Sequence, residues 1–185
     1  MRKYLKILLG LFRLLKYIIL NSGNLKIHGY RYFIGSQVKF WIHSGGTCDL
    51  GTKSWLSEFC FFEANAGKIK LGHNNFFNSN CRLVSMNEIV IGDNNLFGPN
   101  VVIVDHKHNY EDPNTLICNQ GITTSPIKIG SDNWICSNVV ITDGVTIADH
   151  IVVASNSVVN KDLVKPGVYA GTPAKLIKER KLQNE

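Results

Sequence analysis

Two histidines stand one residue apart in the polar stretch VDHKHNY. They are His106 and His108, and Asp105 comes directly before the first. A neutral imidazole near pH 7 can take a proton from a reacting hydroxyl group, and a neighbouring carboxylate can orient the ring. The stretch therefore contains a candidate general base, His106 or His108, with Asp105 as a candidate orienting group.

The histidine pair lies in a segment that interrupts a repeat of six residues. The repeat is clearest in the apolar residues that begin six consecutive units: Ile129, Ile135, Ile141, Ile147, Val153 and Val159. A period of six fits neither a helix nor a long strand, but it fits a short strand followed by a turn. Gly, Asp, Asn and Ser fill the turns, and three units would close one coil of a triangular solenoid. The interruption, at about 105–126, must loop out from a corner, and loops on rigid scaffolds often carry chemistry.

Over about residues 34–165 the repeat resembles the pattern [LIV]-[GAED]-x-x-[STAV]-x of the hexapeptide-repeat transferases. The motif D-H-x-H, followed by a loop and by P-I-x-I-G-x-x-x-W-I, is similar to the maltose, galactoside and capsular-polysaccharide O-acetyltransferases. This resemblance implies an all-β fold, a left-handed parallel β-helix that is an exception to right-handed crossover. It also implies acetyl transfer from acetyl-CoA to a sugar or surface-glycan hydroxyl, without a metal, by a homotrimer.

The same resemblance assigns roles to residues of the central site. It makes His106 the general base, while His108 is its competitor for that role or an acceptor contact. Asn78 matches an acceptor-binding Asn, although an ordinary corner residue is an equal alternative. Trp134 matches a Trp near the subunit interface and acceptor, and Met86 occupies the position of an acceptor-binding Asp. That departure favours a larger glycan over a small free sugar.

The C-terminal sequence KPGVYAGTPAKLIKER resembles the family ending P-x-x-V-x-x-G-x-P-A-[KR]-x-[IL]-[KR]. By resemblance, residues 166–185 form a CoA-binding tail, in a short helix or an irregular segment. Clustered cations suit a polyanionic cofactor, although a solvated basic tail is the alternative. The residues expected to bind CoA are Ser137, Ser155, Lys161, Pro173, Lys175 and Lys178.

The N-terminal segment, residues 1–33, carries most of the positive charge. Eight basic residues and no Asp or Glu precede Asp49, so the net charge of +6 belongs to this end. This distribution is unlike the spread basic surface of a nucleic-acid binder. In a helix, residues 2–20 place basic side chains on one side and Leu and Ile on the other. Arg13 and Lys16 would interrupt any membrane-spanning segment. The helix either lies on an anionic membrane or packs on protein, and both alternatives predict a cytoplasmic chain, peripheral to the plasma membrane in the first case.

Three other classes of protein share features with this sequence. The γ-class carbonic anhydrases share the β-helix and bind zinc through three His, but their H-x4-H pair is missing from this sequence. The five Cys contain no CxxC pair and fit free thiols in a reducing compartment. A xenobiotic acetyltransferase would share the loop His and the tail, whereas a structural β-helix would have neither.

Overall fold

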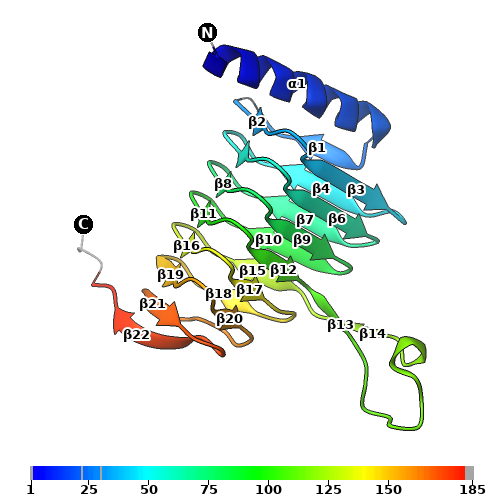
Figure 1. Ribbon diagram of the computed structural model, residues 1–185, viewed down its shortest axis with the longest axis vertical. Helices are drawn as coiled ribbons and strands as arrows, with labels where there is room; N and C mark the ends of the chain where they lie inside the picture. Colours follow the sequence, from blue (N-terminus) through cyan, green and yellow to red (C-terminus); the bar gives the residue numbers. More distant parts are fainter. Residues whose placement is uncertain (1, 22, 30, 182–185) are drawn as a thin grey trace.

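A computed structural model describes residues 2–21, 23–29 and 31–181. One helix, α1 (Arg2–Leu20), precedes a long series of short strands that wind into a solenoid (Figure 1). Within the described residues no helix combines the length and apolarity needed to cross a membrane. The chain is therefore built around strand stacking, with α1 at one end.

Three parallel sheets, named A, B and C, form the walls of the solenoid. Sheet A contains β1 (Leu25–Ile27), β4 (Thr47–Leu50), β7 (Lys68–Leu71), β10 (Glu88–Ile91), β15 (Ile127–Ile129) and β18 (Thr146–Ile147). Sheet B contains β2 (Phe33–Ile34), β5 (Trp55–Leu56), β8 (Phe76–Phe77), β11 (Leu96–Phe97), β16 (Trp134–Ile135), β19 (Ile151–Val153), β21 (Gly167–Ala170) and β22 (Lys175–Glu179). Sheet C contains β3 (Lys39–His43), β6 (Phe61–Asn65), β9 (Arg82–Ser85), β12 (Val102–Val104), β17 (Val140–Ile141) and β20 (Val158–Val159). The repeat strands thus begin before residue 34 and continue after residue 165.

Successive strands of the chain pass from sheet A to B to C, so three strands make one coil. Each strand pairs in parallel with its equivalent one coil away, as β10 does with β7 and β15. The apolar residues that begin the six clearest units are each at most 3% exposed. The predicted fold, a left-handed parallel β-helix, is confirmed.

The core is a set of columns of like side chains. Phe77 and Phe97 stack with ring centroids 4.3 Å apart and planes 1° from parallel. Phe62 meets Phe77 edge-on at 5.6 Å, and all three rings are at most 1% exposed. Because coils lie about 4.8 Å apart, equivalent residues are in direct contact, and large rings can fill the prism only by stacking.

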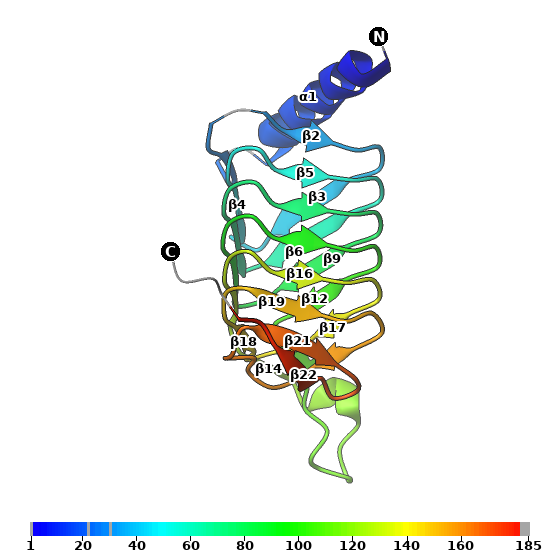
Figure 2. The ribbon, with the colours of Figure 1, turned by 90° about the vertical axis from the view of Figure 1, so that its left-hand side faces the viewer.

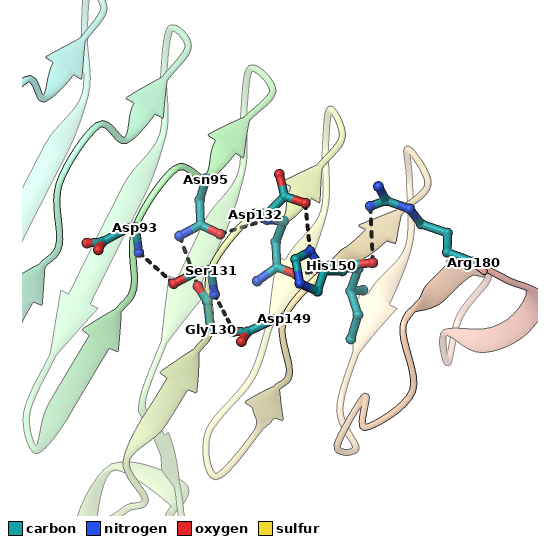
Figure 3. Close-up of polar contacts among 10 residues, drawn as sticks. Asp93, Asn95, Gly130, Ser131, Asp132, Asp149, His150 and Arg180 are labelled. Atoms are coloured by element: carbon teal, nitrogen blue, oxygen red, sulfur yellow. Dashed lines mark hydrogen bonds and ion pairs between the residues drawn. The ribbon is translucent and has the colours of Figure 1, made fainter. Parts of the chain in front are cut away.

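Polar columns hold the corner between sheets A and B (Figure 3). The buried amide of Asn95 donates to the carbonyl of Gly130 at 3.0 Å, and its oxygen accepts from the backbone N–H of Asn133 at 3.0 Å. On the outside, Ser131 Oγ accepts from the N–H of Asp93, and the Ser131 N–H donates to Asp149. These bonds satisfy backbone groups that the tight corner turns leave without strand partners.

Helix α1 lies across one end of the solenoid (Figure 2). A Cβ at Gly10 would lie 3.0 Å from both N and O of Ile34, so only glycine allows this approach. Leu14 is 4% exposed, and the Tyr17 hydroxyl donates to the Val38 carbonyl at 2.8 Å. One face of the helix is therefore packed on the protein, as one of the two sequence-based alternatives predicts.

At the other end the tail, as far as the structure describes it (residues 166–181), takes the form of a strand and contains no helix. Strand β22 pairs antiparallel with β21, which itself continues sheet B in parallel with β19. All five residues of β22 are exposed. The described part of the expected tail is thus an extended edge of sheet B.

We predict that Phe97→Ala destabilises the fold by about 3–5 kcal/mol, because it opens a gap in the phenylalanine column. Leu96→Ala, on the outer side of the same strand and 51% exposed, should change stability by no more than about 0.5 kcal/mol. Denaturant unfolding at a fixed protein concentration measures both. Equal losses in the two variants would contradict the column as the source of stability.

Candidate active site

A buried carboxylate lies at the corner between sheets C and A. Asp105 follows β12, and its side chain is 0% exposed. Its Oδ2 accepts hydrogen bonds from Ser85 Oγ at 2.7 Å and from the N–H of Asn87 at 2.9 Å, and its Oδ1 accepts from the N–H of Met86 at 2.8 Å. A buried charge is tolerated only when such donors replace water, so this carboxylate is fixed in place.

The position of Asp105 follows from strand register. Ser85 pairs with Ala64 one coil earlier, and both point into the prism at the end of sheet C. The next residue to reach this corner is Asp105, after Val104 pairs with Val84. Inward-facing Ser85 thus meets the carboxylate from the coil before it.

The interrupting segment leaves and re-enters the solenoid at this corner. Strands β13 (His106–His108) and β14 (Ile122–Thr124) pair antiparallel and form an arm, and the 3₁₀ helix η1 (Ile117–Asn119) lies on its returning limb, before β14 (Figure 1). The Ser125 N–H donates to the Asp105 carbonyl at 2.8 Å, which closes the base of the arm. The arm is therefore held at its base, where the first histidine stands.

His106 lies against the buried carboxylate. Its Nδ1 is 3.2 Å from Asp105 Oδ1, and its side chain is 16% exposed. An ionised carboxylate only accepts, so the Nδ1 of a neutral ring carries the proton and Nε2 is left with a free lone pair. An imidazole held in this tautomer can act as a general base through Nε2.

His108 lies farther out on the arm, opposite Ile122, and is exposed. Its ring has no hydrogen-bond or ion-pair partner among the described residues. The geometry therefore distinguishes the two histidines, because only His106 has an orienting carboxylate. An exposed, unoriented ring is suited to a ligand contact rather than to positioned proton transfer.

The predicted site residues fall into two groups within one chain. Met86 and Lys161 share the corner between sheets C and A with Asp105 and His106. Asn78, Ser137, Ser155, Trp134, Pro173, Lys175 and Lys178 lie on sheet B or at its corner with sheet C. A strand of sheet C, four residues in β9, separates the groups by roughly 13 Å. One chain therefore brings its candidate base close to Met86 and Lys161, but not to the acceptor and CoA residues of the second group.

The residues of the second group differ in their surroundings. Asn78 Oδ1 accepts from the N–H of Ser79 at 2.8 Å and so stabilises its own turn. Burial raises the pKa of the Cys136 thiol, against a smaller opposing effect of its hydrogen bond with Ser155. Trp134 is 53% exposed on the outer face of sheet B. Lys175 and Lys178 are exposed on β22, where they are available to an anionic ligand.

Sequence reasoning missed two residues that donate hydrogen bonds to the buried carboxylate, Ser85 and Asn87, and a third, Thr124, that bonds to Asn87. Ser85 supplies a hydroxyl, Asn87 a backbone N–H, and the Asn87 amide also donates to Thr124 Oγ1 at the base of the arm, at 3.1 Å. The sequence signal that could have identified them is Ser85 and Asn87 on either side of Met86, at the corner one coil before the interruption. Among the described residues, no cluster of His, Cys, Asp or Glu has the geometry of a metal site.

Comparisons with known proteins agree with this fold. Residues 126–161 match the family model of the bacterial transferase hexapeptide (six repeats). Galactoside O-acetyltransferase of Escherichia coli is 36% identical over 132 residues, which are 70% of this chain and 63% of that protein. The putative lipopolysaccharide biosynthesis O-acetyl transferase WbbJ of E. coli is 31% identical over 61% of each chain. The chain spans 52–63% of the length of the first curated relatives that it matches.

A solved structure is similar to this chain over most of both lengths. The hexapeptide-repeat acetyltransferase of Vibrio cholerae, crystallised with acetyl coenzyme A, is 35% identical, with a TM-score of 0.66. The match covers 74% of this chain and 72% of that protein. With its six-residue repeat, its coiled sheets and this degree of identity, the chain belongs to the hexapeptide-repeat acetyltransferase family.

Proposed function

We propose that the protein is an acetyl-CoA-dependent O-acetyltransferase that acts on a hydroxyl group of a sugar or surface-glycan intermediate. The observation that carries the proposal is the Asp105–His106 pair, a buried and fully bonded carboxylate 3.2 Å from a partly exposed imidazole. Family membership supplies the reaction class, and relatives named for galactoside and lipopolysaccharide acetylation support a sugar acceptor.

In the proposed reaction the acceptor oxygen attacks the thioester carbonyl carbon directly. Nε2 of His106 takes the hydroxyl proton as the new C–O bond forms, and the imidazolium is stabilised by Asp105. The C–S bond then breaks, the proton passes from Nε2 to the departing sulfur, and the products are an acetyl ester and CoA. Such base catalysis contributes about 10²–10⁴-fold, and holding the two reactants together contributes much of the rest.

Acetyl-CoA would bind along sheet B and its corner with sheet C. Ser137 and Ser155 lie in equivalent turns of adjacent coils, and backbone groups of such turns suit the amides of pantetheine. Lys175 and Lys178 on β22 would meet the phosphates, with Pro173 near the adenine. Lys161 would approach the cofactor from the opposite corner.

A homotrimer would complete the site. His106 and Lys161 share one corner while Asn78, Trp134 and Ser137 share another region, so a cyclic arrangement can bring one copy's base to the next copy's cofactor. The outer face of sheet C carries half-buried valines that another copy could cover: Val84, Val102, Val104, Val140 and Val158. Leu116 and Ile117 on the arm are 72% and 57% exposed and could reach a neighbour.

The second face of α1 supports contact with the inner surface of the plasma membrane. Opposite the packed Gly10 and Leu14, the helix exposes a row of apolar side chains: Leu8, Leu11, Phe12, Leu15 and Ile19, each 45–68% exposed. Lys16 borders this row, and the absence of acidic residues before Asp49 favours an anionic lipid surface.

We predict that His106→Ala lowers kcat for acetyl transfer by about 10²–10⁴-fold, because the hydroxyl loses its base. His108→Ala should instead raise KM for the acceptor and leave kcat within a few fold. Thiol release from acetyl-CoA, assayed with mono- and oligosaccharides, measures both. Equal kcat in wild type and His106→Ala would overturn the assignment.

The shared site predicts complementation between two inactive variants. His106→Ala mixed in equal amounts with Asn78→Ala/Trp134→Ala during refolding or co-expression should regain about a quarter of wild-type activity, because random trimers contain that share of intact sites. Each variant alone should stay inactive. No gain over the separate variants would show that each site lies within one chain.

For the membrane contact, Leu11→Ser/Phe12→Ser/Leu15→Ser should reduce binding to phosphatidylserine-containing vesicles by at least about tenfold, because apolar area is lost. Val164→Ser changes an equally exposed apolar residue outside α1 and should leave binding unchanged. Cosedimentation with vesicles with and without phosphatidylserine measures this. Unchanged binding of the triple variant would leave α1 as an end cap only.

A further inference from the structure

Sheet B carries a column of aromatic and apolar side chains on its outer face. Strand pairing sets them in register, one per coil: Phe33, Trp55, Phe76, Leu96 and Trp134. Figure 2 shows the strands of this sheet stacked one above another from α1 to β21. The column, called the sheet B stripe, thus leads from the candidate cofactor region to the helix end.

Trp55 is held by aromatic contacts on both sides within the sheet B stripe. Its ring stacks on Phe33 with centroids 4.1 Å apart and planes 22° from parallel, while Phe33 itself is 8% exposed. On its other side Trp55 meets Phe76 at 6.1 Å. The indole is 38% exposed and is supported from beneath, so it presents a fixed apolar surface to solvent.

The surface beside Trp55 is hollowed. A cavity of about 380 Å³ is lined by Tyr32, Phe33, Ser54 and Trp55, with the cationic side chains Arg31 and Lys53 at its margin. A second hollow of about 220 Å³ lies between Phe33 and α1. Concave sites with aromatic walls and a few polar groups are typical of small-molecule binding.

The fold does not require aromatic residues at these positions. The corresponding outer column of sheet A reads Lys26, Asp49, Lys70, Val90 and Lys128. Sheet A has the same coil spacing and the same buried core, yet its outer face is charged. The sheet B stripe therefore reflects what that face contacts. Its members Trp55, Leu96 and Trp134 are 38%, 51% and 53% exposed, so no described part of this chain covers them.

Exposed amides run along both sides of the sheet B stripe. On one side Asn74 donates to Asn94 at 2.9 Å, at the corner with sheet A. On the other side Asn78 and Asn80 stand at the corner with sheet C. A narrow apolar strip between rows of amides suits a sugar chain, because each ring has an apolar face and a polar edge. A protein partner or lipid would favour a broader apolar patch.

We propose that the sheet B stripe is an extended acceptor subsite and that Trp55 stacks against a sugar ring of an oligosaccharide. This inference rests on the proposed acetyltransferase function and narrows its acceptor to a chain of sugars. Trp55 lies three coils from Trp134, roughly 14 Å along the stripe, which exceeds the length of a single sugar. The far end of the chain would point toward α1, the end that we propose to rest on the membrane.

The test uses acceptors graded by length. Surface polysaccharide of the source organism is stripped of O-acetyl groups with mild base, partly hydrolysed and separated into fragments from one to six sugars. For the wild-type protein, kcat/KM for acetyl transfer should rise with fragment length. Trp55→Ala should remove that rise, lowering kcat/KM for the longer fragments by about 3- to 10-fold and leaving the monosaccharide unchanged.

Two conservative variants separate stacking from apolarity. Trp55→Phe keeps a ring face and should retain most of the length dependence, whereas Trp55→Leu keeps only apolar area and should behave like Trp55→Ala. Activity that is independent of length in the wild type, or an equal loss at all lengths in Trp55→Ala, overturns this inference but leaves the acetyltransferase standing. Failure of the wild type to acetylate a fragment of any length overturns the proposed function as well.

Discussion

In-register stacking of the coils is the constraint on which the rest of this structure depends. Each strand pairs with the equivalent strand one coil away, so every position on the prism becomes a column of neighbours in contact. A column stabilises the stack when its members match in shape or in hydrogen-bonding capacity. The stacked phenylalanines inside and the asparagine amides at the corner are two solutions to the same requirement.

The candidate site arises where a column changes its chemistry. Along the inner end of sheet C the residues run from Ala64 to Ser85 to Asp105, so the column passes from a methyl group to a hydroxyl to a carboxylate. A buried carboxylate there would be costly in a regular coil. It is tolerated because the corner before it turns two backbone N–H groups inward, and because the arm leaves the prism immediately after it. The interruption and the charge thus depend on each other.

The sequence predicted the columns well, because periodicity reports directly which residues face inward. Strand β10 places two apolar residues inward, since Ile89 and Ile91 both point into the core. Hydrogen bonds across coils were beyond prediction, because Ser85 and Asp105 are 20 residues apart and meet only through register. The extended form of β22 was not predicted either, because its pairing with β21 is antiparallel and does not follow the six-residue repeat.

The three walls of the prism face different surroundings, and this difference links the proposals. Sheet A is mostly charged and sheet B carries the aromatic stripe. The outer face of sheet C carries valines on its later coils, after Phe61 and Arg82 on its earlier ones, although all three sheets enclose one core. A solenoid fixes its inner faces by packing and leaves its outer faces free to differ. The base stands at the meeting of the valine and charged walls, and the aromatic wall belongs to the opposite side of sheet C. In the trimer that we propose, the valine wall would be covered, and the same contact that buries apolar surface would also bring His106 to its substrate.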